Sequence, residues 1–177
     1  PHVVDIKLPD GITTLPPGCL GDLGSQNKSN YMLINGLTSQ QFEDQFGYTD
    51  QNGQTQVPEF ATIESLVIPE SYVYLDHECA YRARIRHLVI GRNVKEIRGG
   101  AFGNSTTLED LDFASGINNL KIGTLAFGEC KSMKHIALSE GIYSIGSNAF
   151  SNSQNLESIR LPESLIYIGT ESFKNCL

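Results

Sequence analysis

Apolar residues recur along this chain with a period of about 23 residues, and phenylalanine marks that period most clearly. Phe102, Phe127, Phe150 and Phe173 follow one another at intervals of 25, 23 and 23 residues. In the two clearest units, residues 133–150 and 156–173, every apolar position coincides. This self-similarity predicts a stack of coils of one shape. We expect the four phenylalanine rings to form a single file along the core of that stack.

Six units of this kind can be aligned, one in residues 1–20 and about five in residues 61–177. Each contains a short segment with period-two alternation, as at 158–161, where Ile159 and Leu161 face one side. Because one unit is too small to bury its apolar side alone, stacked units should pair these segments into a parallel β-sheet with a continuous core behind it. We expect a second short extended turn at the Ile-Gly pairs, and a short helical or irregular return at the Ala-Phe pairs.

The full repeat reads L-x-x-I-x-L-P-x-x-L-x-x-I-G-x-x-A-F-x-x-C, and the last unit fits it at Leu156, Ile159, Leu161, Pro162, Ile168, Gly169, Phe173 and Cys176. This pattern resembles that of the BspA-like (Treponema-type) leucine-rich repeat family, over residues 1–20 and 61–177. We therefore predict an α/β repeat fold. It is a right-handed leucine-rich-repeat solenoid with a parallel β-sheet on one face and short strands, turns or helical returns elsewhere. The resemblance also implies a bacterial surface or secreted protein, in some members an adhesin for host matrix proteins.

Residues 21–60 interrupt the period with a polar, glutamine-rich stretch. We interpret this segment as an insertion that holds a degenerate repeat, with a strand at 33–34, and a short helix carrying Phe42 and Phe46 on one side and ending at Gly47. The prediction is thus a single domain, 1–177, with a first repeat at 1–20, the insertion at 21–60 and about five repeats at 61–177. Insertions often carry binding function, although a packing patch is the simpler interpretation.

The two ends of the chain also carry expectations. The last unit stops at Leu177 without the polar capping unit that terminal repeats normally require. We expect either that the natural protein continues with further repeats or that another molecule covers this end. The chain begins at Pro1, which we interpret as a processed or truncated start. Localisation therefore follows from the resemblance alone, which implies an extracellular or cell-surface protein.

Composition and charge narrow the classes of function. The chain has 177 residues and a mass of 19.4 kDa, about the length of one domain. Its 20 acidic and 13 basic residues give a formal net charge of −7, which disfavours a general nucleic-acid binder. No apolar run approaches the roughly 20 residues that a membrane-spanning helix needs.

The sequence carries no catalytic motif, since it lacks a phosphate loop, G-x-G-x-x-G, H-E-x-x-H and G-x-S-x-G. One row of candidates remains: His87, Asp110 and His135 each precede a buried strand position. They should lie on adjacent strands of the open sheet face, about 5 Å apart. Such a row can bind a metal ion or act as an acid–base set, but a solvated polar ladder is the simpler interpretation. We favour the ladder and predict no enzyme, no cofactor and no metal site.

The remaining candidate binding residues are Val67, Val89 and Arg160 in the next outward column, and Arg82, Arg84 and Arg86 in a basic run. The mixed column predicts a modest protein-binding surface, and the basic run would suit an acidic protein segment or an anionic glycan. We predict a non-catalytic protein-binding module whose partner is a protein, such as a host extracellular matrix or plasma protein. The competing prediction is a structural spacer or scaffold in a larger surface protein, with no ligand of its own.

The four cysteines fall into two columns of the repeat. Cys130 and Cys176 lie two units apart in one column, about 10 Å at the backbone, which exceeds the reach of a disulfide of about 7 Å. We predict that they are buried thiols that fill the core. Cys19 and Cys79 share another column, and they become neighbours only if the insertion loops out completely.

Overall fold

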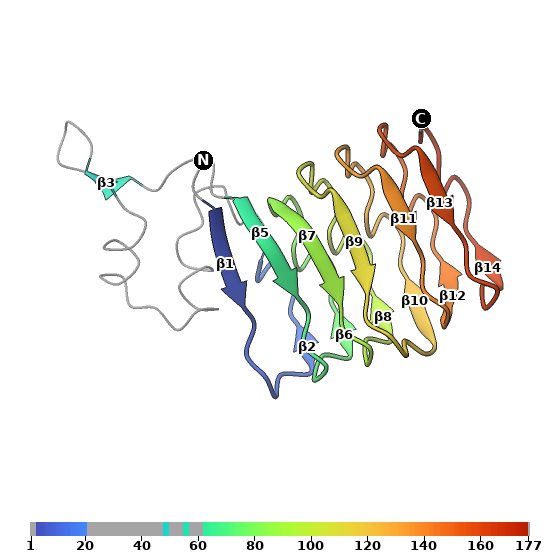
Figure 1. Ribbon diagram of the computed structural model, residues 1–177, viewed down its shortest axis with the longest axis horizontal. Helices are drawn as coiled ribbons and strands as arrows, with labels where there is room; N and C mark the ends of the chain where they lie inside the picture. The colour runs from blue at the N-terminus through green and yellow to red at the C-terminus, as the bar shows by residue number, and fades with distance from the viewer. Residues whose placement is uncertain (1–2, 21–47, 50–54, 57–61, 177) are drawn as a thin grey trace.

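The structure is a computed structural model that describes residues 3–20, 48–49, 55–56 and 62–176. The chain winds into six stacked coils, and each coil contributes one strand to each of two sheets (Figure 1). We number the coils 1 to 6 from the N-terminus; they span 3–20, 62–84, 85–107, 108–132, 133–155 and 156–176. The stack of similar coils that the period predicts is therefore present.

The strands of the first sheet are β1 (Val3–Lys7), β5 (Thr62–Val67), β7 (Ile85–Ile90), β9 (Asp110–Phe113), β11 (His135–Ala137) and β13 (Ser158–Arg160). Those of the second sheet are β2 (Thr14–Leu15), β6 (Tyr74–Leu75), β8 (Glu96–Ile97), β10 (Leu120–Ile122), β12 (Ile142–Ile145) and β14 (Tyr167–Ile168). Neighbouring strands come from successive coils and pair in parallel. A separate antiparallel pair consists of β3 (Tyr48–Thr49) and β4 (Thr55–Gln56).

Period-two alternation explains the first sheet. In β11 the side chain of Ile136 is buried between the exposed His135 and Ala137. The register pairs Ile136 with Leu111 of the preceding coil and Ile159 of the following one. Equivalent apolar side chains therefore stack along the solenoid, and each coil covers the apolar side of its neighbour.

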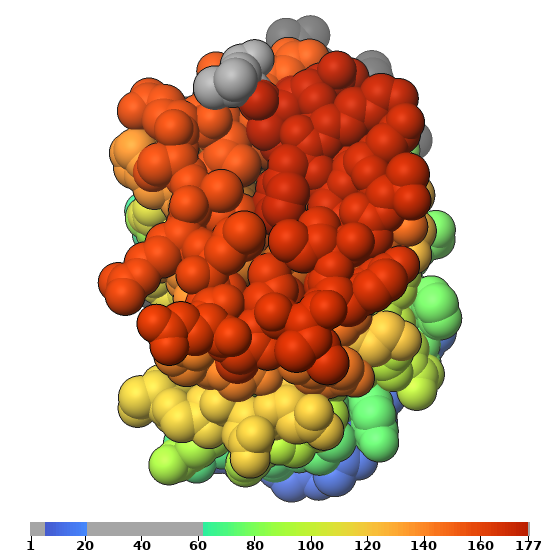
Figure 2. All heavy atoms as spheres, turned by 90° about the vertical axis from the view of Figure 1, so that its right-hand side faces the viewer, coloured from blue at the N-terminus to red at the C-terminus, as the bar shows by residue number. Residues whose placement is uncertain are grey.

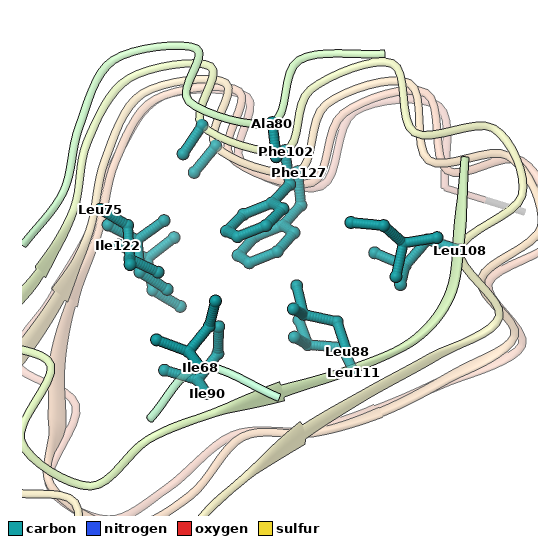
Figure 3. Close-up of a cluster of buried hydrophobic side chains, with 14 of the residues drawn as sticks. Ile68, Leu75, Ala80, Leu88, Ile90, Phe102, Leu108, Leu111, Ile122 and Phe127 are labelled. Atoms are coloured by element: carbon teal, nitrogen blue, oxygen red, sulfur yellow. The ribbon is translucent and has the colours of Figure 1, made fainter. Parts of the chain in front are cut away.

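The four phenylalanine rings form the expected file. Successive centroids of Phe102, Phe127, Phe150 and Phe173 lie 5.4, 5.4 and 5.5 Å apart, with interplanar angles of 4°, 7° and 5°. Figure 3 shows the rings of Phe102 and Phe127 at the centre of the core, in line with Ala80. Residues of both sheets surround them, including Ile68, Leu75 and Leu88, all fully buried. The central prediction from the sequence is confirmed.

The turns after the second sheet repeat as strictly as the strands. Each of coils 2 to 6 holds residues there at positive φ, in two columns: one runs Glu78, Gly100, Leu125, Asn148 and Glu171, the other Arg82, Asn104, Glu129, Asn152 and Asn175. At Gly123 and Gly146 the coils approach so closely that a Cβ would lie 2.7 and 2.6 Å from the backbone of the preceding coil. Close approach therefore explains the glycine of the Ile-Gly pairs.

Some expectations are refined. The Ile-Gly pairs follow the strands of a second sheet, and the returns at the Ala-Phe pairs are turns, with no helix in the described part of the chain. The helical component of the expected α/β class is therefore not confirmed. The strand expected at 33–34 and the helix expected to end at Gly47 lie outside the described residues. Of residues 21–60 the structure describes only the pair β3 and β4, which the sequence did not predict.

The C-terminal coil leaves apolar side chains at the end of the stack, which Figure 2 views face-on. Ile166 is 81% exposed, and Leu161, Tyr167 and Ile168 are also exposed. In the earlier coils the residues equivalent to Ile168, such as Ile145, are fully buried beneath the following coil. The described residues also include no helix capable of crossing a lipid bilayer.

Candidate functional site

The first candidate site is the outward face of the first sheet. Strand register places Ser65, His87, Asp110, His135 and Ser158 in one column along this face. A second column contains Lys7, Val67, Val89 and Asp112, with Ala137 and Arg160 in coils 5 and 6. The alternation in the sequence thus predicts the placement of both columns correctly.

His87 and Asp110 meet in the first column. His87 Nδ1 lies 2.6 Å from an Asp110 carboxylate oxygen, and His87 Nε2 lies 3.5 Å from Glu64 Oε1. Arg86 joins them, because its guanidinium lies 2.9 Å from Glu64 Oε2 and 3.3 Å from Glu109 Oε1. All five side chains are partly exposed, so these pairs lie in a well-hydrated environment where each contributes little to stability.

His135 turns away from this cluster. Its Nδ1 lies 2.9 Å from Ser158 Oγ, and its Nε2 lies 3.9 Å from Glu157. The histidine–aspartate–histidine row therefore splits into a pair, His87 with Asp110, and a separate His135. Among the described residues there is no group of three histidine, cysteine or acidic side chains arranged to hold a metal ion.

The second column changes character along the solenoid. Val67 is 52% exposed and Val89 is partly exposed, whereas the column ends in Arg160. The face thus offers a small apolar patch in coils 2 and 3 beside the charged cluster of Arg86, His87 and Asp110. Aliphatic contact next to charged groups suits a modest protein interface.

The basic run spreads over several surfaces. Arg86 lies on the open face, whereas the Arg82 amide donates to Gly103 O and the Arg84 carbonyl accepts from Ile63 N, both in the return of coil 2. Farther along, Arg92 pairs with Glu70, and Arg98 lies between Asp76 and Glu96. Acidic residues of neighbouring strands and coils therefore neutralise much of the run.

Sequence reasoning missed an open groove at the turns beyond the second sheet. It consists of two adjoining cavities of about 340 and 490 Å³ that share His77, Gly99 and Thr124 in their walls. The glycines of coil 3 and the exposed Tyr81 of coil 2 were the available signals. Their proximity depends on which columns of the turn point outward, which the strand alternation does not indicate.

Charge pairs set the electrostatics of one end of the groove. Asp76 accepts a hydrogen bond from the His77 backbone N–H at 2.7 Å and another from Arg98 at 3.1 Å, and these lower the pKa of its carboxyl. For Glu96, partial burial acts to raise the pKa, but hydrogen bonds from Lys121 and Arg98 outweigh it and lower the pKa. Arg98 also lies over the Tyr74 ring, 5.2 Å from its centroid.

The four cysteines are free thiols and are poorly suited to chemistry. Burial raises the pKa of Cys19 and of Cys130 to about 12, so neither forms a thiolate near neutral pH. Cys19 and Cys79 do become neighbours, because coil 2 packs directly on coil 1: the Cys19 thiol lies 3.7 Å from the Cys79 carbonyl oxygen. The insertion therefore leaves the stack uninterrupted.

Comparison with known proteins gives consistent results. The family described as the BspA type leucine rich repeat region (6 copies) matches residues 58–177, more than half of the chain. A leucine-rich cell surface protein of Faecalibacterium prausnitzii is 28% identical, with a TM-score of 0.59 over 73% of this chain and 35% of its own. No curated protein sequence matches.

Two further solved structures share the fold. A leucine-rich repeat protein of Bacteroides ovatus is 20% identical, with a TM-score of 0.53 over 66% of this chain and 36% of its own. The pneumococcal vaccine antigen PcpA is also 20% identical, with a TM-score of 0.50 over 66% of this chain and 34% of its own. The present chain spans about a third of the length of these three proteins.

Proposed function

The chain belongs to the BspA-type leucine-rich repeat family, and on that premise we propose that it is a non-catalytic protein-binding module of a bacterial surface or secreted protein. The finer proposal is adhesion to a host extracellular matrix or plasma protein. The cell-surface description of the Faecalibacterium protein supports the location, which we propose to be extracellular. No catalytic family is indicated by the match.

The observation that carries this proposal is the open face of the first sheet. Parallel sheets are normally covered on both faces, whereas the described residues leave this one facing outward along all six strands. Its exposed valine, Val67, lies near the charged cluster of Arg86, His87 and Asp110. An extended face of this kind suits a protein surface better than a small ligand.

A binding assay on immobilised fibronectin, fibrinogen and laminin tests the proposal. We expect the chain to bind at least one of them and Val67→Glu to weaken that binding at least about tenfold, because a carboxylate would be desolvated at the centre of the apolar patch. Ile12→Glu is the matched control, since Ile12 is similarly exposed but lies between β1 and β2, outside both sheets. Equal losses in both variants would exclude the sheet face.

The alternative proposal is a spacer without a ligand. It is supported by the mutual neutralisation of charges, as in the pairs that Arg86 forms with Glu64 and Glu109. If the folded chain binds none of the three proteins, the spacer is favoured. If the chain does bind, deleting residues 21–60 distinguishes the sheet face from the insertion: binding that survives the deletion does not depend on the insertion.

A further inference from the structure

The groove beyond the second sheet is separate from the face proposed above and has the construction of a ligand site. Its two cavities, about 490 and 340 Å³, are both of the size at which proteins bind small molecules. Their walls come from coils 2 to 6, from Tyr81 at one end to Tyr167 at the other. Four coil spacings of about 4.8 Å make this an elongated site of roughly 19 Å.

The floor of the larger cavity is a notch centred on coil 3, which has glycine at 99, 100 and 103. Coil 2 has Glu78 and Tyr81 beside it, and coil 4 has Leu125, with glycine again at 128. Gly100 has φ +67°, and a Cβ there would lie 3.2 Å from Glu78 Cγ and 3.9 Å from Glu78 Oε1, both atoms of one side chain. No backbone atom blocks this position, and a side chain would fit after a small shift of the Glu78 side chain.

Two exposed apolar side chains flank the notch. Tyr81 is 37% exposed and leans onto Gly103, where a Cβ would lie 3.2 Å from its ring. Leu125 is 47% exposed although it occupies a left-handed position, φ 56°, that Gly100 and Asn148 fill in neighbouring coils at less conformational cost. At the far end Tyr167 is 55% exposed. Aromatic rings thus mark both ends of the site.

The polar side chains of the groove have hydrogen-bonding capacity to spare. Within the described part of the chain, the His77 ring, the Glu78 carboxylate and the hydroxyls of Thr124 and Ser147 make no hydrogen bond or ion pair with another residue. The backbone of the floor is different, because it is already paired between coils: Gly100 N donates to Thr124 O and Asn104 N to Gly128 O. Recognition here must come from side chains.

We propose that this groove binds a neutral oligosaccharide. A pyranose ring has an apolar C–H face, which stacks on an exposed tyrosine, and a rim of hydroxyls, which pair with carboxylate, imidazole and hydroxyl groups. An extended peptide is a poorer occupant, since it is recognised through main-chain hydrogen bonds that this floor cannot supply. An anionic glycan is also disfavoured, because Glu78 and Glu129 line the larger cavity. In the smaller one Arg98 and Lys121 are already paired with Asp76 and Glu96.

The test is a heteronuclear NMR titration of the intact chain with cellotriose, maltotriose and chitotriose. A heparin disaccharide and a tri-lysine peptide are the comparison probes. We expect at least one neutral trisaccharide to shift amide signals of Gly99, Gly100 and Thr124. Tyr81→Ala and Gly100→Asn should each weaken that binding at least about tenfold, the first by removing the stacking ring and the second by filling the notch.

Matched controls keep the result interpretable. Gly116→Asn makes the same change at another left-handed glycine, φ +82°, outside the groove, and Tyr143→Ala removes a tyrosine that does not line it. Both should bind like the parent chain, as should Val67→Glu. The proposal is overturned if no neutral trisaccharide shifts the groove signals, if only the heparin disaccharide or tri-lysine does so, or if folded Gly100→Asn binds undiminished.

Discussion

The two N-terminal coils and the four C-terminal coils follow the same backbone path with different side chains. In coils 3 to 6 the core position is filled by phenylalanine, whereas Leu20 and Ala80 fill it in coils 1 and 2. The backbone ladder nevertheless continues: Leu20 N donates to Cys79 O at 2.6 Å, as Phe127 N donates to Ala149 O at 2.8 Å. The path of the coil therefore depends on the backbone hydrogen bonds and the turns, and the phenylalanine ring fills its interior.

Tyr72 explains how coil 2 dispenses with its phenylalanine. Its side chain is 1% exposed, at a column where later coils have the smaller Val94, Leu120 and Ile142. Burial raises the pKa of the Tyr72 hydroxyl, and the nearby Cys19 adds to that effect. Coil 2 thus buries one aromatic ring, as coils 3 to 5 do, but in another column of the repeat. We infer from this difference that a buried aromatic ring in either column can fill a coil.

The largest expected effect comes from breaking the phenylalanine file. Phe127→Ala removes a fully buried ring stacked on both sides, and we expect a loss of about 3–5 kcal/mol in the free energy of unfolding, measured with urea. Phe173→Ala is the control, because its ring is partly exposed and, among the described residues, stacks only on Phe150. Equal losses would contradict the expectation that burial and stacking on both sides set the cost.

A double-mutant cycle tests the exchange of volume in coil 2. Ala80→Phe alone should overpack the coil and destabilise the protein by about 1–3 kcal/mol. Combined with Tyr72→Ile, which makes room, it should restore most of the loss and extend the file to a fifth ring. Additive losses in the urea midpoint would mean that Tyr72 and position 80 do not share the same space.

A smaller effect on stability is expected in the column that contains Ser105, Cys130, Ser153 and Cys176, in coils 3 to 6. Cys130 donates to Phe102 O at 3.5 Å and Cys176 to Phe150 O at 3.1 Å, but the buried hydroxyls of Ser105 and Ser153 have no partner among the described residues. Since a thiol extends farther from Cβ, Ser153→Cys should gain roughly 1 kcal/mol of stability. Cys130→Ser should lose a similar amount, and a gain there would contradict the explanation. Both are read from thermal unfolding.

The sequence predicts the repeated features of this molecule well and the singular ones poorly. Period and alternation predict the file of Phe102 to Phe173 and the outward columns of the first sheet, because each pattern recurs in several coils. Two other features occur once: the exchange between Tyr72 and Ala80, and the split of His135 from Asp110. Both depend on side-chain rotamers and volumes within single coils, which no periodicity encodes. The groove was missed for the same reason.

Variants in the left-handed column that contains Gly100, Leu125 and Asn148 test separately what the fold requires and what the groove requires. Leu125→Asn places at φ 56° a residue that tolerates this conformation, so we expect a gain of roughly 1 kcal/mol in stability. Asn148→Leu makes the reverse change in the same column and should lose a similar amount. If Leu125→Asn instead destabilised the chain, its exposed side chain would be a packing element, and its place in the groove would need no ligand.

The smallest expected effects are on the pH dependence of stability. They test whether the N-terminal and C-terminal coils lose stability together. Asp76 of coil 2 and Glu140 of coil 5 each accept backbone N–H hydrogen bonds, from His77 and from Glu163 and Ser164, which lower the pKa of both carboxyls. A carboxyl with a lower pKa in the folded state stabilises the protein above its unfolded value, 3.8 for Asp76 and 4.5 for Glu140, and this contribution is lost as the pH falls through the folded value.

Asp76→Asn and Glu140→Gln should therefore be slightly less stable than the parent near neutral pH and should converge with it in acid. Hydrogen exchange resolved by residue measures the response of each region. We expect Asp76→Asn to loosen coils 2 and 3, which Asp76 joins through Arg98, and Glu140→Gln to loosen coils 5 and 6. If either variant loosened all six coils equally, the stack would unfold as one unit, and the difference between its two regions would be one of composition alone.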